Sequence, residues 1–497
     1  MTADSREARR LALQAELDAQ KTAASRNRLG QFATPPFLAR EVVREALALL
    51  PAGDAVRFLD PAFGTGSFFS ALLDEAPAGR LSRSAGFEID GHYGEPAREL
   101  WRESGLDLSL GDFTRAEPRE PKATLIVCNP PYVRHHHLEP ADKLRLQALG
   151  ERATGIRLSG LAGLYAHFML LAQSWAAEGA VAAWLVPAEF LDVNYGAGLR
   201  RYLAEKVTLL RLHRFDAGDV QFGDALVTSA VLWWRHRPPP PGHEALFTSG
   251  GSIATPRRSE TVGVERLRSA SKWAGVFADG GDGDGEETAG TLGDLFTIRR
   301  GVATGDNRFF ILSEAEIETR GLPLECFQPI LPGPRGLGAG VTVIEADSEG
   351  RPRLAKRHYL LECRLPESEI AEKHPALWRY LQSGVPEVSG RYLCRHRTPW
   401  YAQDHRPPPP LLCTYMGRGE TPFRFLLNRS RATAPNVYLL LYPKPGPAAD
   451  PEMIERLWRS LNDTGTAALI AAGRVYGGGL HKLEPRELAG LPLAKMF

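Results

Sequence analysis

The sequence has little of several features that define other classes of protein. Its 497 residues hold no apolar run near the roughly 18 residues that a membrane-spanning helix needs. The amino-terminal stretch MTADSREARRLALQAELDAQ alternates charge with Leu and Ala, so it has no apolar signal core. The five cysteines are scattered without a CxxC pair, which suits a reducing cytosol and gives no zinc-ligand spacing. We therefore expect a cytoplasmic protein with no membrane segment and no metal.

Net charge is also nearly absent, because 60 Lys and Arg residues stand against 59 Asp and Glu residues. The balance is uneven along the chain: Arg351–Asn436 holds 15 basic and 7 acidic residues. A basic segment in an otherwise mildly acidic chain suits an anionic polymer partner. Arginine side chains that cover an apolar surface give the same count, so charge alone leaves both interpretations open.

Composition divides the chain into two halves. RPPPPG at Arg237–Gly242 interrupts regular structure because proline lacks the backbone donor, and DGGDGDGEETAG at Asp279–Gly290 has the composition of a flexible linker. At roughly 100–200 residues per domain, the length allows about two to four domains. We predict an amino-terminal helix over residues 1–24, a first domain over 25–240, a linker region over 241–290 and a second domain over 291–497.

The first half alternates segments that are typical of helices and of strands. Ser5–Ala24, Pro36–Leu50 and Tyr165–Ala177 have helical patterns. The β-prone runs are Val56–Leu59, Ala85–Ile89, Leu125–Cys128, Val181–Val186 and Ala230–Trp234. This alternation predicts a doubly wound, mostly parallel α/β sheet, with Trp233 and Trp234 as packing residues. The second half, richer in proline, glycine and aromatic residues, predicts a mixed α/β domain.

A glycine turn follows the first of these strands. FLDPAFGTGSFF at Phe58–Phe69 combines an apolar strand, an acidic residue and a turn that opens a helix, and Gly64 and Gly66 let its backbone approach a ligand closely. The sequence has neither the GxxxxGK[ST] pattern of a phosphate loop nor the three spaced glycines of a dinucleotide fingerprint. Asp60 beside the turn would repel a pyrophosphate but attract a cationic amino-acid group. The loop therefore favours S-adenosylmethionine.

Two later segments complete the predicted cofactor site. Glu88, in FEID at the end of the next strand, is suited to accept hydrogen bonds from ribose hydroxyls. In GDF at Gly111–Phe113, Asp112 suits an adenine amino group and Phe113 the face of the adenine ring. The predicted cofactor-binding residues of these three segments are Asp60, Pro61, Ala62, Phe63, Gly64, Gly66, Glu88, Ile89, Asp112 and Phe113.

A further segment, LIVCNPPY at Leu125–Tyr132, runs from a buried strand directly into Asn-Pro-Pro-Tyr. A rigid turn explains the prolines, but the segment lies at the carboxyl end of a central strand, where doubly wound sheets bind ligands. An exocyclic amine on an aromatic base is a poor nucleophile because its lone pair is delocalised. The Asn129 side-chain oxygen and the Pro130 carbonyl would accept its two N–H bonds and free the lone pair for attack on a methyl sulfonium, while Tyr132 stacks on the base.

In this order, Phe58–Phe69, Phe87–Asp90, Gly111–Phe113 and Asn129–Tyr132 resemble the S-adenosylmethionine-dependent adenine-N6 DNA methyltransferases, which flip the target base out of the duplex. GQFATPPF at Gly30–Phe37 resembles the upstream cofactor motif of their gamma class, the Taq-type enzymes. By that resemblance Thr34 contacts the methionine end of the cofactor, and Pro131 joins the cofactor-binding set.

VQFGDALVTS at Val220–Ser229 resembles the segment that supplies a second aromatic residue, so Phe222 would sandwich the flipped adenine against Tyr132. Asp224 and Ala225 stand where relatives often have a basic residue, which leaves the other contacts of the base pocket open.

Two segments of the second half resemble the opening and closing parts of DNA target-recognition domains: LGDLFTIRRGVATGDNRFFIL at Leu292–Leu312 and GRVYGGGLHKLEPRELAGLPL at Gly473–Leu493. The resemblance implies a Rossmann-like S-adenosylmethionine-dependent methyltransferase domain followed by a mixed α/β target-recognition domain. It implies double-stranded DNA as the substrate and a separate restriction endonuclease as a candidate partner. Candidates for phosphate or guanine contacts are Arg395, Arg397, Arg418 and Arg424, although a solvated arginine explains each one alone.

Two alternatives stay open. An RNA or protein-glutamine N-methyltransferase uses the same amine chemistry, although the upstream motif and the long second half argue against it. A non-catalytic DNA-binding component is the other, and the intact Asn129–Tyr132 argues against that. His135–His137 lack acidic or thiol partners at helical spacing and predict a loop near DNA rather than a metal site, while Cys128 is expected to be a small core residue.

Overall fold

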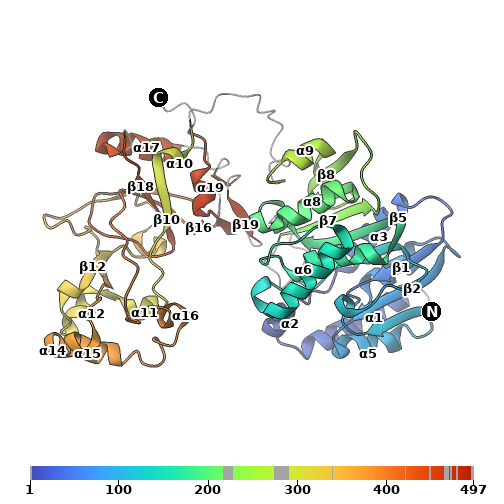
Figure 1. Cartoon of the computed structure of the whole chain (residues 1–497), viewed down its shortest axis with the longest axis horizontal. Helices are drawn as coiled ribbons and strands as arrows, with labels where there is room; N and C mark the ends of the chain where they lie inside the picture. The colour runs from blue at the N-terminus through green and yellow to red at the C-terminus, as the bar shows by residue number, and fades with distance from the viewer. Residues whose placement is uncertain are drawn as a thin grey trace. The chain divides into compact units, whose positions relative to one another are not determined.

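The computed structural model describes residues 3–216, 228–273, 290–338, 340–419, 421–446, 449–463, 469–470, 473–476 and 480–493. The chain divides into two compact units near residue 280 (Figure 1). Of the predicted linker Asp279–Gly290, all but Gly290 lies outside the described residues.

The first unit is built on a sheet of nine strands among its described residues. In sheet order they are β3 (Leu106–Leu110), β2 (Leu81–Glu88), β1 (Val56–Asp60), β4 (Ala123–Cys128), β5 (Ala176–Pro187), β7 (Ser229–Arg235), β6 (Thr208–Arg214), β8 (Glu244–Gly251) and β9 (Pro256–Gly263). Neighbours from β3 to β5 pair in parallel, and β7 runs antiparallel to β5 and β6. The predicted doubly wound, mostly parallel sheet is confirmed.

Both faces of the sheet are buried at its centre, as the nearly continuous apolar strands β4, β5 and β7 require. In β5, Trp184 and its alternate neighbours pack on one face, while Leu185 and its alternate neighbours pack on the other. Trp233 and Trp234 are fully buried on opposite faces, as predicted.

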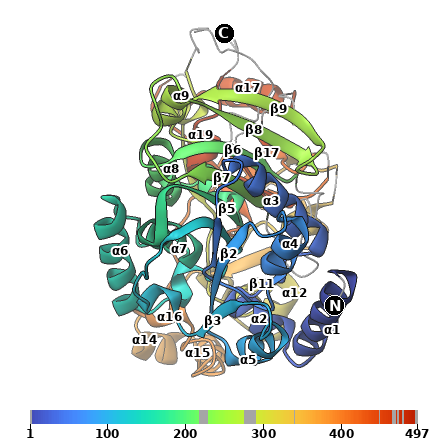
Figure 2. The same ribbon diagram turned by 90° about the vertical axis from the view of Figure 1, so that its right-hand side faces the viewer.

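The helices divide between the two faces (Figure 2). Helices α3 (Pro36–Leu49), α4 (Ser67–Glu75) and α5 (Gly91–Leu100) cover one face. Helices α7 (Leu164–Leu171) and α8 (Ala197–Glu205) cover the other, and α6 (Pro140–Thr154) packs on α7.

The predicted linker over residues 241–290 is wrong for its first part. β8 pairs in parallel with β6, and β9 pairs with β8, so both strands extend the same sheet. Helix α9 (Val264–Ser269) follows and packs on α8. The four prolines after Arg237 therefore form a connection between strands rather than the end of the domain.

The amino-terminal helix also differs from its prediction. Helix α1 covers Ala3–Ala19, and a separate helix α2 covers Ala23–Leu29. α1 contacts both α4 and α5, so it packs into the first unit. Among the described residues, none of the helices combines the length and apolar character needed to cross a bilayer.

The second unit has three smaller sheets among its described residues, in line with the predicted mixed α/β character. The largest has the order β10 (Phe296–Arg300), β18 (Tyr438–Pro443), β15 (Leu411–Thr414), β17 (Phe425–Asn428) and β13 (Val343–Ile344). The others are β11 (Ile311–Ser313), β14 (His358–Leu361) and β12 (Phe327–Ile330), and β16 (Met416–Gly417), β20 (Leu480–Lys482) and β19 (Arg474–Tyr476). Its helices are α10 (Leu292–Leu295), α11 (Asn307–Phe310), α12 (Glu314–Thr319), α13 (Pro334–Leu337), α14 (Glu367–Lys373), α15 (Pro375–Gln382), α16 (Tyr392–Arg395), α17 (Pro451–Asp463) and α19 (Pro485–Ala489).

Candidate active site

The Asn-Pro-Pro-Tyr segment begins where β4 ends, at the carboxyl edge of the sheet. Asn129 Nδ2 donates to the Phe32 carbonyl oxygen at 2.9 Å and to Thr34 Oγ1 at 3.2 Å. Because a carbonyl oxygen can only accept, the Phe32 contact fixes which end of the amide faces it.

The other end of that amide is Asn129 Oδ1, which is buried and accepts no hydrogen bond from any described residue. Leaving a buried acceptor without a donor costs about 1–3 kcal/mol, so such an atom in a folded protein needs an explanation. A ligand N–H at this position would supply the missing donor. The oxygen that the sequence predicts as an amine acceptor is therefore oriented and unpaired among the described residues, and its contact with an amine stays a prediction.

Tyr132, three residues further along the chain, is held by two hydrogen bonds. Its backbone N–H donates to the Gly30 carbonyl at 3.1 Å, and its hydroxyl donates to the Leu185 carbonyl at 3.2 Å. Its ring centroid lies 5.5 Å from that of Phe32, and the residue is 8% exposed. Burial raises the pKa of the Tyr132 hydroxyl well above its ordinary value, so the side chain stays neutral.

Gly30 allows the upstream motif to lie directly against this segment. A Cβ at Gly30 would stand 2.2 Å from the Tyr132 backbone nitrogen, and its φ of +66° is one that side chains disfavour. The two motifs are therefore in backbone contact. Phe222, the predicted second aromatic partner of the base, lies outside the described residues, as do Asp224 and Ala225.

The glycine turn joins β1 to α4. Gly64 and Gly66 have φ values of +57° and +90°. A Cβ at Gly66 would lie 2.7 Å from the Phe63 ring and from the Trp101 indole nitrogen, so that glycine is needed for packing. A Cβ at Gly64 would meet no atom within 4 Å. The turn is thus closed on its protein side and open at Gly64, where a ligand has room.

Glu88 lies at the end of β2 and braces this turn. One carboxylate oxygen accepts from the Gly64 backbone N–H at 2.8 Å and the other from the Asp90 backbone N–H at 2.8 Å. Each oxygen has a second acceptor position, so the predicted contact with ribose hydroxyls is possible and stays a prediction. Burial raises the pKa of Glu88. The neighbouring Ile89 is 71% exposed, which presents an apolar surface beside that carboxylate.

Asp60 is a buried carboxyl group at the end of β1. It is 1% exposed, and its Oδ1 accepts from the Ala62 backbone N–H at 3.1 Å. Burial, together with the nearby Glu88 carboxylate, raises the pKa of Asp60 to about 7. Cys128 is fully buried beside it, so its predicted place in the core is confirmed.

The GDF segment differs from its predicted role in part. Asp112 Oδ1 accepts from the backbone N–H and the hydroxyl of Thr114, so it caps the short turn η1 (Phe113–Arg115). Phe113 is 3% exposed and packs edge-on against Phe87 at 5.5 Å between ring centroids. The Phe113 ring therefore lies in an aromatic core cluster, not on an open surface. Contact of either residue with adenine stays a prediction.

The remaining predicted site residues lie near these groups in the chain. Pro61, Phe63 and Pro130 are buried, whereas Ala62 and Pro131 are half-buried. Phe63 joins the turn to β2, because its backbone N–H donates to the Phe87 carbonyl at 2.8 Å.

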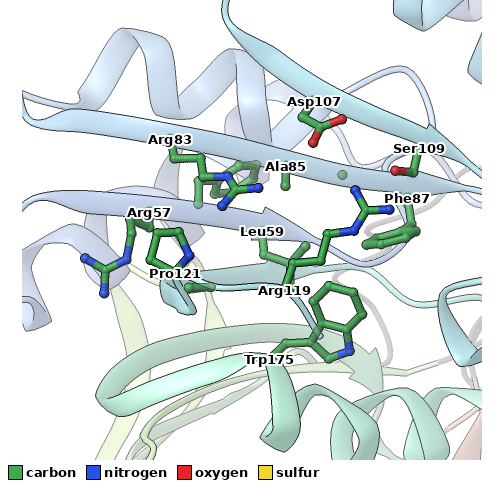
Figure 3. A pocket seen from close by; sticks show the side chains of 13 residues that line it. Arg57, Leu59, Arg83, Ala85, Phe87, Asp107, Ser109, Arg119, Pro121 and Trp175 are labelled. Atoms are coloured by element: carbon green, nitrogen blue, oxygen red, sulfur yellow. The ribbon is translucent and has the colours of Figure 1, made fainter. Parts of the chain in front are cut away.

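A cavity of about 40 Å³ lies elsewhere, over the middle of β1, β2 and β3 (Figure 3). Arg57, Arg83, Arg119 and Trp175 are among its lining residues. Two of these arginines bind the backbone that leads into β4: Arg57 donates to the Lys122 carbonyl at 2.6 Å, and Arg83 to the Glu120 carbonyl at 3.1 Å. Ligand pockets usually measure about 300–1,000 Å³, so this cavity is too small for a cofactor.

The three consecutive histidines form the short turn η2 (His135–His137), in which the ring centroids of His136 and His137 are 4.2 Å apart. Within the part of the chain that the structure describes, no group of three or more His, Cys, Asp or Glu residues is arranged to hold a metal ion.

The four arginines predicted to contact DNA fall into two kinds. Arg397 donates to the carbonyls of Ala303 and Thr304 at 2.7 and 2.9 Å, and Arg424 donates to the Gly338 carbonyl at 2.6 Å. Those two guanidinium groups form hydrogen bonds between distant segments of the second unit. Arg395 and Arg418 are exposed, and the Arg395 guanidinium lies 5.3 Å from the centroid of the Tyr392 ring. DNA contact stays a prediction, and exposure favours Arg395 and Arg418.

Sequence reasoning missed the main-chain acceptor that orients Asn129. The Phe32 carbonyl does so through its backbone, and a backbone contact leaves no residue-type signal. It also missed the polar side chains of α1 that reach the glycine turn, because charged residues in an amphipathic helix indicate a solvated face.

The residues present fit S-adenosylmethionine. An open glycine turn, the Glu88 carboxylate with an exposed Ile89 beside it, a buried Asp60 and the unpaired Asn129 Oδ1 all lie at the carboxyl ends of neighbouring strands, at one edge of the sheet. Ligands of open α/β sheets bind at that edge. Together with the strand order, this site defines the class: a Rossmann-like, S-adenosylmethionine-dependent methyltransferase fold with an additional carboxyl-terminal domain.

Comparisons with known proteins show which proteins this chain is similar to. The Eco57I restriction-modification methylase family matches residues 111–221, and the C-terminal domain family of the type II methyltransferase M.Eco57I matches residues 284–497. The type II methyltransferase M.XamI of Xanthomonas campestris pv. amaranthicola is 29% identical over 472 residues, which span 92% of this chain and 84% of that protein. M.AccI of Acinetobacter calcoaceticus is 22% identical over 481 residues, 93% of this chain and 85% of that protein.

The solved structure of the Type IIL restriction-modification enzyme MmeI, in complex with DNA, shares the fold. It aligns with a TM-score of 0.59 and 14% identity over 98% of this chain and 70% of that chain. Both family models and both curated relatives are type II restriction-modification methyltransferases, so the resemblance that the motifs predicted is confirmed.

Proposed function

We propose that the protein is a site-specific DNA methyltransferase that transfers the methyl group of S-adenosylmethionine to the N6 amine of adenine in duplex DNA. The observation that supports this most directly is the buried, unpaired Asn129 Oδ1, held in place by the Phe32 carbonyl and Thr34. It stands where an exocyclic amine would supply the missing donor.

Asn129 Oδ1 and the Pro130 carbonyl accept the two N–H bonds of the amine. Drawing the protons toward these oxygens would localise the nitrogen lone pair, so that an N–C bond to the methyl group could form while its bond to sulfur breaks and a neutral thioether leaves. One amine proton leaves to water afterwards. Because both acceptors are fixed before the base arrives, little reorganisation accompanies the reaction.

S-adenosylmethionine supplies a methyl group bonded to a positively charged sulfur. The open turn at Gly64 and the Glu88 carboxylate would hold it, and the Asp60 carboxyl group, when ionised, would attract its cationic amino-acid end. No metal is needed for this chemistry.

The base has to leave the duplex to reach Asn129, so we propose base flipping, with Tyr132 and Phe222 stacking on the extruded adenine. The second unit would read the DNA sequence, with Arg395 and Arg418 as its candidate phosphate or base contacts. A separate restriction endonuclease would recognise the same site.

The test is incubation of the protein with S-adenosylmethionine labelled in the methyl group and duplex DNA of varied sequence, with RNA and protein acceptors in parallel. Label in duplex DNA, confined to one sequence context, supports the proposal. Transfer to RNA or to glutamine amides, with none to DNA, would favour the alternative methyltransferase and contradict the proposal.

A further inference from the structure

We propose that helix α1 is part of the cofactor site. Arg10 and Gln14 on α1, and Lys21 just beyond its end, are positioning residues: they fix the glycine turn and the adjoining edge at which ribose is proposed to bind. The inference rests on the S-adenosylmethionine part of the proposed function and is independent of which base is methylated. None of these residues belongs to a motif that the sequence singled out.

The first attachment is at Thr65, between the two glycines of the turn. Arg10 Nη1 donates to Thr65 Oγ1 at 3.1 Å, and the same hydroxyl donates to Gln14 Oε1 at 2.7 Å. Both partners lie on α1. On the other side of the turn, the Trp101 indole N–H donates to the Thr65 carbonyl at 2.9 Å. The residue between Gly64 and Gly66 is therefore held from α1 on one side and from Trp101, the residue directly after α5, on the other.

Arg10 itself is rigid. It is 1% exposed, and two of its nitrogens donate to the two carboxylate oxygens of Glu7 at 2.9 and 2.6 Å. A buried, bidentate ion pair adds little net stability but fixes geometry, since either partner alone would be an unpaired buried charge. A guanidinium fixed in this way keeps its third nitrogen directed at Thr65.

The second attachment is at the ribose edge. The Lys21 ammonium forms an ion pair with Asp90, and Gln31 Nε2 donates to the same carboxylate oxygen at 2.7 Å. Asp90 in turn caps α5 by accepting from the His92 backbone N–H at 3.0 Å, and its own backbone N–H binds Glu88. The chain beyond α1, the upstream motif and the Glu88 carboxylate thus meet at one residue.

These contacts matter because two glycines with positive φ make the turn flexible when it is unsupported. A turn that has to be ordered at the moment of binding reduces the affinity for its ligand, and one that is ordered in advance does not. α1 therefore acts on cofactor affinity through Thr65 and Asp90. This effect does not require α1 to touch the reacting atoms.

The test uses the full chain without DNA and measures Kd for S-adenosylmethionine and S-adenosylhomocysteine by calorimetry. Thr65→Val removes the hydroxyl that binds α1 and leaves the Arg10–Glu7 pair intact. We expect Kd to rise roughly tenfold, which corresponds to about 1.4 kcal/mol. Lys21→Met should raise it at least about threefold, and Thr65→Ser should retain the original Kd because it keeps the hydroxyl.

The matched control is Ser70→Ala. Ser70 Oγ donates to Glu7 Oε2 at 2.5 Å, so this variant also removes one hydroxyl bound to α1, but it lies on α4, beyond the turn. Its Kd should stay within about twofold of the original, even where its thermal midpoint falls.

Equal cofactor affinity in the Thr65→Val and original proteins would overturn the inference. Equal weakening by Thr65→Val and Ser70→Ala would also overturn it, because α1 would then be a structural support only. A rise in Kd specific to Thr65→Val, together with no methyl transfer to adenine, would contradict the proposed function and leave the inference standing. Absence of cofactor binding by the original protein would contradict both.

Discussion

The two ends of the Asn129 amide have different proposed roles, and substitutions at this residue can separate the effects of the two ends. Nδ2 binds the Phe32 carbonyl and Thr34 Oγ1, which orients the side chain, whereas Oδ1 is the unpaired acceptor. Asn129→Ala removes both ends. Asn129→Asp keeps an acceptor but replaces the N–H donors with a second oxygen that faces the Phe32 carbonyl.

The expected magnitude follows from the loss of one of two preorganised amine acceptors. Removing one fixed hydrogen-bonding group that acts on the reacting centre lowers kcat by roughly 10²–10³-fold, or about 2.7–4 kcal/mol. Asn129→Ala should fall in that range. The two Nδ2 hydrogen bonds contribute about 0.5–1.5 kcal/mol each to folding, so a moderate loss of stability should accompany it. The kcat of Asn129→Asp should lie between that of the original protein and that of Asn129→Ala.

The assay is transfer of labelled methyl groups to duplex DNA at saturating cofactor, with binding of cofactor and of DNA measured separately. A matched control is Asn428→Ala, because Asn428 Nδ2 donates to the carbonyls of Pro409 and Ala432 in the second unit, and its Oδ1 accepts from the Ser430 backbone N–H. The control should lose stability and keep kcat.

Unchanged turnover in Asn129→Ala would refute the amine-acceptor mechanism. So would a loss of turnover that is fully explained by weaker binding of cofactor or DNA, because the acceptor is proposed to act on the bound amine.

Three further predictions concern other parts of the molecule. The folded pKa of Asp60 is raised to about 7, so its contribution to stability is present below its unfolded pKa of about 4 and is lost as the pH rises through 7. Relative to Asp60→Asn, the original protein should lose on the order of 2–4 kcal/mol of unfolding free energy between pH 4 and 8, as measured by urea unfolding. Parallel pH profiles of the two proteins would contradict this. Gly30→Ala places a methyl group against Tyr132 and should lower the free energy of unfolding by about 2–4 kcal/mol and abolish transfer, and a stable, active variant would show that the two motifs are not in backbone contact. Arg395→Ala should weaken DNA binding and reduce its salt slope by about one, whereas Arg397→Ala should mainly lower stability, so the reverse pattern would contradict the assignment of these two residues.

The sequence was sufficient for the parts of the fold that depend on local pattern. The glycine turn, the strands that flank it and the continuously apolar β5 were predicted because apolar runs and glycines indicate them directly. The β8–β9 extension was missed, because its strand β9 reads PRRSETVG and lies largely exposed at a sheet edge. An edge strand of this kind lacks the apolar pattern of a buried one.

The motifs of the site could be predicted from the sequence, but the hydrogen bonds between its distant segments could not. The order of the motifs placed Asn129 and Glu88 at the carboxyl edge, yet the contact between Asn129 and the Phe32 carbonyl joins residues 97 positions apart. Arg397 and Arg424 were indistinguishable in sequence from the exposed Arg395, because the carbonyls they bind come from distant segments. Which arginine is structural depends on tertiary contacts.

The identity of the methylated nucleoside tests the central claim most directly. Duplex DNA treated with the protein and S-adenosylmethionine is hydrolysed to nucleosides, which are separated and weighed by mass spectrometry. The oriented, unpaired Asn129 oxygen predicts methylation of an exocyclic amine, which under the proposed function is found as N6-methyladenine. Methylation at carbon 5 of cytosine, a position with no N–H for that oxygen to accept, would contradict it.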